Sequence, residues 1–229
     1  MNAAARISVC SLLLAAGSAE SQYIWNTMVS GTWNNGANWA GPASPSFPST
    51  QGATAEISAG GTYTVTVENN NWAVNTITKT NPNATLLIDS RALQIYGSIV
   101  NQGDTVIAAD PGRSSFLRFR GTGARSITGT GTIQLLSNGT NNQSAAIDRG
   151  TFDEAVVTFG SGQTITGQGR LTVPFVNQGL ISATSGSTNT INTSDDTAVN
   201  QAVISATSGG IIQLRRRPRR PEHRRDQHR

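Results

Sequence analysis

Carboxylates are the residues of this sequence with the clearest capacity for acid–base chemistry. Glycoside hydrolysis needs two of them at a fixed separation, one on each side of the scissile bond. Adjacent strand residues point to opposite faces, so the pairs Asp195–Asp196 and Asp153–Glu154 can reach one substrate only from a turn. Aspartate in a turn usually hydrogen-bonds the local backbone. We predict no catalytic residue among the candidates, which are Asp89, Asp104, Asp110, Asp148, Asp153, Glu154, Asp195 and Asp196.

Other familiar reaction centres are missing from the sequence. The only histidines, His223 and His228, lie near the C-terminal end, so serine–histidine catalysis is excluded from the body of the chain. The Gly-rich stretch GTGARSITGTG lacks the Lys-Ser/Thr ending of a phosphate-binding loop. A Ca²⁺ ion on a carboxylate pair is a weaker alternative, because no G-G-x-G-x-D repeat accompanies the carboxylates. We expect no enzymatic activity, cofactor or metal ion.

Arg118, Arg120 and Arg125 form a small basic group on one expected strand and the following turn. Such a group suits contact with an acidic polysaccharide. The competing interpretation is a solvated face, since isolated charges usually stay in water.

Short segments of alternating polarity must position these residues. Tyr63, Val65 and Val67 alternate with Thr64 and Thr66, and similar segments recur at LQI, LRF, TIQL, LTVPF and IIQL. This period of two predicts half-buried strands, and the Gly and Asn residues between them predict turns. No helical pattern separates the segments, so we predict an all-β fold and exclude a doubly wound α/β fold.

Internal repeats indicate how the strands are arranged. VNQGLISATSG at Val176 returns as VNQAVISATSG at Val199, VNQ also occurs at Val100, and I-T-G-x-G occurs at Ile127 and Ile165. Imperfect copies of a 20–25-residue unit predict a solenoid of stacked strands over residues 60–214, with Asn101, Asn177 and Asn200 in an inward ladder. An antiparallel β-sandwich is the alternative fold.

The N-terminal part divides into two segments. Residues 1–19 combine Arg6, an apolar stretch containing Cys10 and small residues before Glu20, which predicts a secretory signal peptide. Residues 20–59 carry three tryptophans, including Trp33 and Trp39, and several prolines. We expect this Trp-rich segment to cap the repeats, with a sugar-stacking platform as the alternative.

The C-terminal residues 215–229 differ sharply in composition. They hold eight Arg against Glu222 and Asp226, a net of 8 − 2 = +6, so the remainder of the chain carries 4 − 6 = −2. Prolines and high charge density predict a disordered basic tail. The abrupt change suggests that the repeats are truncated and the tail is translated out of frame; an anionic-surface anchor is the alternative.

The W-N-N-G-A-N-W stretch, together with ITGTGTI, ITGQGRL and VNQGLISA, resembles bacterial autotransporter-like passenger proteins, and this resemblance implies that the solenoid is a right-handed parallel β-helix. This resemblance implies a secreted or cell-surface structural or adhesin-like module. We expect contacts with polysaccharide or other surface proteins, no nucleic-acid partner and no transmembrane segment. A carbohydrate-active β-helix enzyme, such as a polysaccharide lyase or hydrolase, or a fragment of one, is the alternative.

Overall fold

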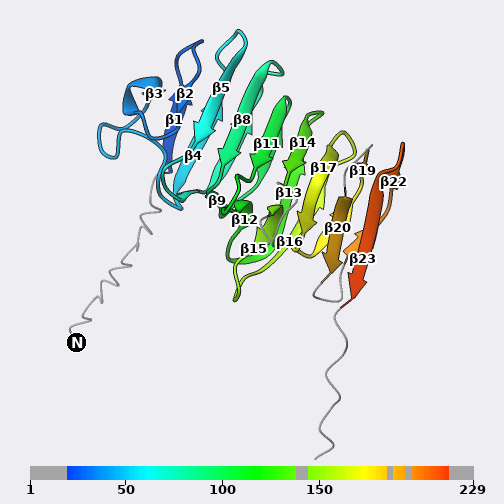
Figure 1. Cartoon of the computed structure of the whole chain (residues 1–229). Coiled ribbons are helices and arrows are strands. Elements are labelled where there is room, and N and C mark those ends of the chain that lie inside the picture. The colour runs from blue at the N-terminus through cyan, green and yellow to red at the C-terminus, as the bar shows by residue number, and fades with distance from the viewer. Residues whose placement is uncertain (1–19, 138–143, 185–187, 194–197, 217–229) are drawn as a thin grey trace, which may run out of the picture.

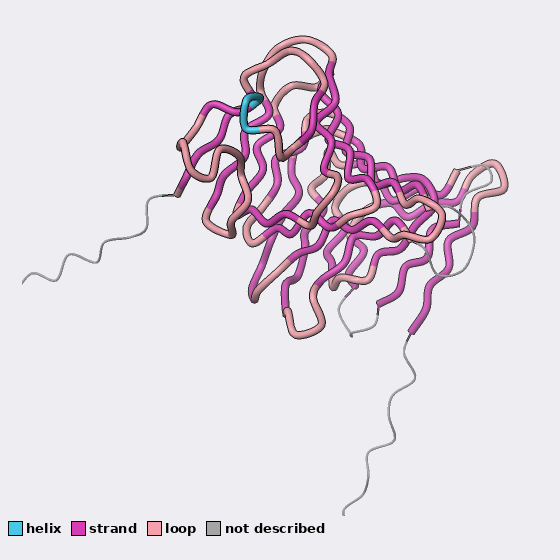
Figure 2. The backbone as a smooth tube through the Cα atoms, turned by 60° about the vertical axis from the view of Figure 1, so that its left-hand side comes forward, coloured by secondary structure: helices cyan, strands magenta, loops and turns pink. Residues whose placement is uncertain are grey.

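The computed structural model describes residues 20–137, 144–184, 188–193 and 198–216. The expected signal peptide and most of the basic tail lie outside these residues. The described part is built from strands, with one 3₁₀ turn at Gly36–Asn38 and no α-helix (Figure 2). The predicted all-β class is therefore confirmed.

The strands form three ladders, named here A, B and C. Ladder A contains β1 (Ser21–Trp25), β3 (Trp39–Ala40), β4 (Ala53–Ile57), β7 (Thr76–Lys79), β10 (Ile99–Asn101), β13 (Thr122–Thr128), β16 (Glu154–Phe159), β18 (Phe175–Asn177) and β21 (Ala198–Asn200). Ladder B contains β2 (Gly31–Thr32), β5 (Tyr63–Val67), β8 (Ala84–Asp89), β11 (Asp104–Ala108), β14 (Thr132–Leu136), β17 (Thr164–Leu171), β19 (Leu180–Ala183) and β22 (Val203–Ala206). Ladder C contains β6 (Trp72–Val74), β9 (Ala92–Ile95), β12 (Ser115–Phe119), β15 (Ala145–Arg149), the second part of β17, β20 (Thr188–Thr193) and β23 (Ile211–Arg216).

From β4 onward the chain visits ladders A, B and C in turn and then returns to A beside its previous strand (Figure 1). We call each such passage a coil. Neighbouring strands are parallel in every described pairing except that of β1 with β3. This parallel pairing rules out the antiparallel β-sandwich.

The coils differ in length, as hydrogen bonds between neighbouring coils along ladder A show. Thr76 donates to Thr54 across 22 residues of sequence. The N–H of Ser126 donates to Ser98 across 28 residues, and that of Gly121 to Asp153 across 32 residues. The two copies of the VNQ repeat pair directly, Val176 on β18 with Val199 on β21. The hydrogen bond from Asn177 to Asn200 between these strands spans 23 residues. The expected 20–25-residue period therefore holds for some coils only.

Alternating residues fill the interior. In β5, Tyr63, Val65 and Val67 are buried while Thr64 and Thr66 are half-buried, as the period of two predicts. An inward row of ladder C runs from Leu93 through the paired positions of the following coils. Burying such rows supplies the main driving force for folding.

The two I-T-G-x-G motifs are not equivalent, contrary to our interpretation of the repeats. Ile127 lies in ladder A, on β13, and pairs with Ile99 and Phe159, whereas Ile165 lies in ladder B and pairs with Ile133 and Ile181. What they share is a glycine with positive φ, at Gly129 and Gly167. A Cβ atom at Gly129 would lie 2.4 Å from the carbonyl oxygen of Asn101 in the preceding coil, so the motif marks a tight bend against a neighbouring coil.

The expected asparagine ladder is interrupted. Asn177 is fully buried and donates from Nδ2 to Oδ1 of Asn200 at 2.8 Å, but Asn200 is exposed. Asn101 is also buried, yet its Nδ2 donates to Oε1 of Gln163 at 3.0 Å, and its Oδ1 accepts from Thr105. Asn177 pairs with Phe159 and so continues the row of Ile127 and Ile99, so it does not stack in the row of Asn101.

Lys79 occupies the position that pairs with Asn101 in ladder A and is buried. Its Nζ donates to the carbonyl oxygens of Ala84 and Asp104. Burial lowers the pKa of the Lys79 amine to about 7, and the nearby Asp104 carboxylate only partly opposes this shift. Lys79 thus carries an ionisable amine into the interior of the stack.

The two ends of the stack differ. At the N-terminal end, β3 runs antiparallel to β1, and Trp25 and Trp33 both pack against Trp39 in edge-to-face contacts with ring centroids 5.1 and 5.0 Å apart. At the C-terminal end, no described strand pairs with the outer edges of β21, β22 or β23. Leu214 continues the inward row of ladder C but is 73% exposed.

Candidate functional site

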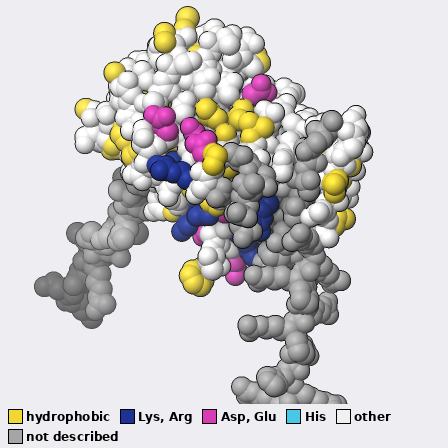
Figure 3. All heavy atoms as spheres, in the orientation of Figure 1, with side chains coloured by type: hydrophobic (Ala, Val, Ile, Leu, Met, Phe, Trp, Pro, Cys, Tyr) yellow, Lys and Arg dark blue, Asp and Glu magenta, His cyan; other side chains and the backbone are white. Residues whose placement is uncertain are grey.

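A groove of about 520 Å³ crosses the corner between ladders B and C. It spans three successive coils, at the turns that precede β6, β9 and β12. In Figure 3, basic side chains gather on the face of the molecule that carries these strands. The groove is lined by Asn69, Asn70, Asn71, Ser90, Arg91, Ala92, Arg113, Ser114, Phe116 and Arg118. These residues include three arginines and no carboxylate, so the lining is positively charged.

Strand register explains why polar residues gather at this corner. Trp72 pairs with Leu93, so Asn69 and Ser90 occupy equivalent places in successive coils, as do Asn70 and Arg91. Asn69 and Ser90 both have positive φ, 65° and 53°, which turns the chain sharply before ladder C. The turns present their side chains one above another along the stack.

Hydrogen bonds between coils fix the floor of the groove. Asn71 Oδ1 accepts from the backbone N–H of Ala92 at 2.8 Å, and Ser90 Oγ accepts from that of Asp110 at 3.1 Å. Ser115 Oγ donates to the carbonyl oxygen of Ile88 at 2.7 Å. These bonds satisfy backbone groups that a sharp turn would otherwise leave unpaired, and they give the groove a defined shape.

Arg118 marks one end of the groove and is held in place. Its Nε and Nη2 atoms donate to the carboxylate of Asp148 on β15, at 3.0 Å to Oδ1 and 2.7 Å to Oδ2. Its guanidinium carbon lies 4.7 Å from the centroid of the Phe116 ring, a cation–π distance. The hydrogen bond to Asp148 raises the pKa of Arg118. Burial raises the pKa of Asp148, and its contact with Arg118 only partly offsets this shift.

The predicted basic group does not act as a unit. Arg120 Nε lies 3.1 Å from Oδ2 of Asp153, so Arg120, like Arg118, is charge-paired. Arg125 lies in ladder A, on β13, and its Nη1 donates to the carbonyl oxygen of Ala124. Of the three arginines named from the sequence, only Arg118 lines the groove.

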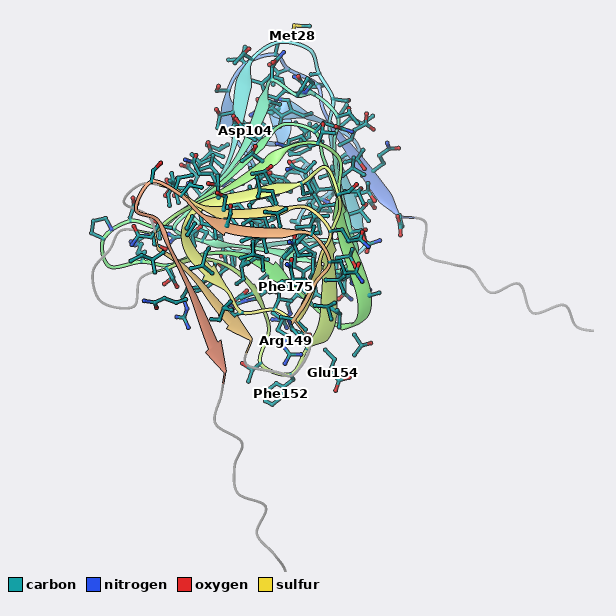
Figure 4. The ribbon with its side chains drawn as sticks, turned by 90° about the vertical axis from the view of Figure 1, so that its right-hand side faces the viewer. Met28, Asp104, Arg149, Phe152, Glu154 and Phe175 are labelled. Atoms are coloured by element: carbon teal, nitrogen blue, oxygen red, sulfur yellow. The ribbon has the colours of Figure 1, made fainter. Side chains whose placement is uncertain are left out.

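A second hollow, of about 530 Å³, lies at the corner between ladders C and A. Arg149, Thr151, Phe152, Asp153, Glu154, Val156 and Pro174 line it. Phe152 is 97% exposed and protrudes at the edge of the molecule beside Arg149 and Glu154 (Figure 4). Charges of both signs meet here, so this hollow has no single charge preference.

The described carboxylates considered as catalytic candidates lie in different strands and turns, and Asp148 and Asp153 are each paired with an arginine. Asp89 ends β8, Asp104 begins β11, and Asp110 follows in the turn before β12. Asp153 accepts from the backbone N–H of Gly121 at 2.6 Å and is paired with Arg120, and Glu154 begins β16. Asp195 and Asp196 lie outside the described residues. Within the described ranges, no three His, Cys, Asp or Glu side chains are grouped to hold a metal ion.

The tryptophan cluster offers no stacking surface to a sugar. Trp33 is fully buried and its Nε1 donates to the carbonyl oxygen of Pro48 at 2.7 Å. Trp39 is nearly buried and donates from Nε1 to the carbonyl oxygen of Trp33 at 2.8 Å. These rings pack with Trp25 inside the N-terminal end of the stack, in a capping position.

Most of the residues that build the groove were missed in the sequence. The signal that identifies them is the regular recurrence of polar residues directly before the strands of ladder C, as at Arg91 and Arg113. Alternation within strands does not reveal this recurrence, because the residues lie in turns. Phe116 was hidden for another reason: it occupies the outward position of a strand, where its apolar side chain breaks the alternation.

Comparisons with protein-family models, with curated proteins and with solved structures find no match to this chain. Over the described part of the chain, none of the helical structure has the length and apolar character needed to cross a bilayer.

Proposed function

We propose that this chain is a right-handed parallel β-helix that serves as a non-catalytic binding module of a secreted or cell-surface protein. The ordered passage through ladders A, B and C supports the β-helix. A right-handed course follows from the strong preference for right-handed connections between parallel strands. The Trp-rich residues 20–59 then act as the cap of the first coil, and the module is of the adhesin-like kind found in passenger proteins.

The ligand we propose is an acidic polysaccharide, bound in the groove between ladders B and C. The observation that carries this proposal is the composition of the lining, which has three arginines and three asparagines without a carboxylate. Guanidinium groups bind sugar carboxylates through paired hydrogen bonds. Asparagine amides both donate and accept, which suits sugar hydroxyls.

The arginines differ in their roles. Arg118 is already paired with Asp148 and stacked on Phe116, so it shapes the end of the groove and contributes little free charge. Arg113 is exposed and Arg91 is half-buried, with an Nη1 bond to the carbonyl oxygen of Ser90. Arg91 and Arg113 therefore provide the charge available to a ligand. The groove is open, so affinity depends on several weak contacts along a repeating polymer.

The same lining argues for binding without catalysis. General acid–base cleavage of a glycan needs a positioned proton donor or acceptor next to the scissile bond. Asn, Ser and Arg line the groove, and Asp148, beyond its end, is bound to Arg118. A lyase or hydrolase with its site in this groove would lack the carboxylate pair that such chemistry uses.

Binding to polygalacturonate tests the proposal, with fully methyl-esterified polygalacturonate as the neutral control. Wild-type protein is expected to bind the acidic polymer only, and Arg91→Gln combined with Arg113→Gln should weaken binding by about tenfold or more, since two charge-assisted contacts are lost. Arg149→Gln, the same change in the second hollow, should leave binding unchanged. Equal loss in both variants, binding to both polymers, or cleavage of either would contradict the proposal.

A further inference from the structure

The C-terminal end of the stack exposes three strand edges at once. β21, β22 and β23 are the last described strands of ladders A, B and C, and no described strand covers them. Apolar side chains surround these edges: Val199, Val203, Ile211 and Leu214 are all exposed, and Ile204 and Ile212 are partly buried against the core. Exposed edges of this kind bind further strands.

The last coil repeats a surface that is already an interface. Residues 199–209 match residues 176–186 at nine of eleven positions. In the preceding coil, Val176 and Asn177 pair with β21, and Leu180, Ile181 and Ser182 pair with β22. The uncovered side of the last coil therefore presents almost the same sequence as a side that another coil covers. Its partner must offer strand edges in the same three-sided arrangement.

The N-terminal end of another copy does not offer that arrangement. There, β3 runs antiparallel along β1 and the aromatic cluster of Trp25, Trp33 and Trp39 fills the interior. Head-to-tail stacking into a filament would require this end to open. The C-terminal end of a second copy, in contrast, carries three matching free edges.

We propose that two copies of this chain associate through their C-terminal ends around a two-fold axis. Rotation about that axis reverses the strand direction, so β22 pairs antiparallel with β22 of the second copy, and β21 faces β23. The edge of a β-strand accepts either direction. An isologous contact closes on itself, which yields a dimer and not a fibre. The apolar side chains of Ile204, Ile212 and Leu214 then meet across the contact.

Charge sets the conditions for this association. Residues 215–229 of each copy carry a net +6 and follow directly after Leu214. Two copies that meet at this end bring like charges together, and salt screens such repulsion. Dimerisation should therefore strengthen as salt concentration rises, the opposite of an association driven by opposite charges.

The test is the molar mass of the full chain in solution, measured by light scattering and analytical ultracentrifugation at several salt concentrations. Wild type should form a dimer, and small-angle scattering should show a particle about twice as long as the monomer. Leu214→Lys should raise the dissociation constant by about tenfold or more, because a charge would be buried in an apolar contact. Val29→Lys, a matched change at an exposed apolar residue in the loop that precedes β2, should not.

Each alternative outcome overturns the proposal. A wild-type chain that stays monomeric at high salt would show that no second copy binds the C-terminal end. Open-ended oligomers would mean that the closed N-terminal end participates. A monomer that binds a synthetic peptide of residues 198–216 would assign the end to an added coil from another polypeptide. Equal effects of Leu214→Lys and Val29→Lys would place the contact elsewhere.

Discussion

The two ends of this molecule differ in how the interior of the stack is covered. At the N-terminal end, three tryptophans close the interior, and Tyr23 in the first strand donates to the carbonyl oxygen of Pro45 in the loop after β3. At the C-terminal end, the row of ladder C finishes at Leu214, which is largely exposed. The contrast shows that a stack of parallel strands does not close itself: a separate, non-repetitive segment must cover its last coil.

The contrast also divides the interior into two environments. Near the closed end, side chains such as Trp33 and Lys79 are shielded from water, and the side-chain nitrogens of these two residues are hydrogen-bonded. Toward the open end, residues in inward rows, such as Asn200 and Leu214, are exposed. A given side chain should therefore contribute less to stability as its coil approaches the open end.

The largest test of this contrast replaces a side chain at each end. Trp33→Ala should lower the free energy of unfolding by about 3–5 kcal/mol, because it leaves a cavity in the closed end. In the monomer, Leu214→Ala should change it by no more than about 0.5 kcal/mol, since an exposed side chain loses little on truncation. The comparison is therefore made at low salt and low protein concentration, where the proposed dimer dissociates. Urea titration followed by circular dichroism measures both. Similar losses for the two variants would abolish the distinction between the ends.

A smaller effect is expected from Lys79 and depends on pH. Below pH 7 the amine is charged in the folded and unfolded protein, so the cost of burying the charge is fully present. Above the folded pKa of about 7 only the unfolded chain keeps the proton, up to its ordinary value of 10.5, and stability rises with pH in this window. The slope attributable to Lys79 approaches about 1.4 kcal/mol per pH unit.

Lys79→Met isolates this slope when unfolding is measured from about pH 7 to about 9.5. The variant should lose the rise in stability that wild type shows. Leu214→Lys places an amine at the open end, where it should add no slope. The range stops below the titration of Tyr23 and Tyr63, because burial raises the pKa of both and stability falls with pH once the unfolded tyrosines ionise. Equal slopes for wild type and Lys79→Met would show that Lys79 is not shielded.

The smallest effect compares two stacked asparagines. Asn177 donates to Asn200 and to the carbonyl oxygen of Val203, and its Oδ1 accepts from Gly179, so Asn177→Ala should cost about 1–3 kcal/mol through unsatisfied buried groups. Asn200→Ala removes an exposed side chain and should cost about 0.5 kcal/mol. Thermal unfolding of the two variants ranks them. At low salt and low protein concentration, where the proposed dimer dissociates, an equal or larger loss for Asn200→Ala would mean that the last coil is covered even in the monomer.

The sequence indicated the strands better than their stacking. Alternation located strands such as β5 and β12, because a half-buried strand imposes a period of two on its residues. The VNQ repeat located a true pairing, at Val176 and Val199. The I-T-G-x-G repeat misled, since a glycine bend is required in either ladder and does not specify which one.

The groove could not be foreseen from local patterns. Two of its arginines come from turns, and turn residues carry no burial period. Arg118 was identified from its strand, but its partner Asp148 lies 30 residues further along the sequence. No sequence motif indicates the length of the coil between them, so the pair could not be predicted. Pairing between coils depends on these unequal lengths, so contacts such as that of Asn101 with Gln163 appear only once the register is fixed.

The unequal coil lengths have a consequence for how such a protein can change over time. The coil that begins at Ile99 and returns at Ile127 is longer than the one that begins at Ile77 and returns at Ile99, yet the strands on either side remain paired. The extra residues are taken up between the strands, and doubling the length of a loop costs only about 0.6 kcal/mol in closure entropy. Insertions at a corner can therefore alter the residues offered to a ligand while the packed rows stay as they are. Recognition and architecture in this molecule are free to evolve separately.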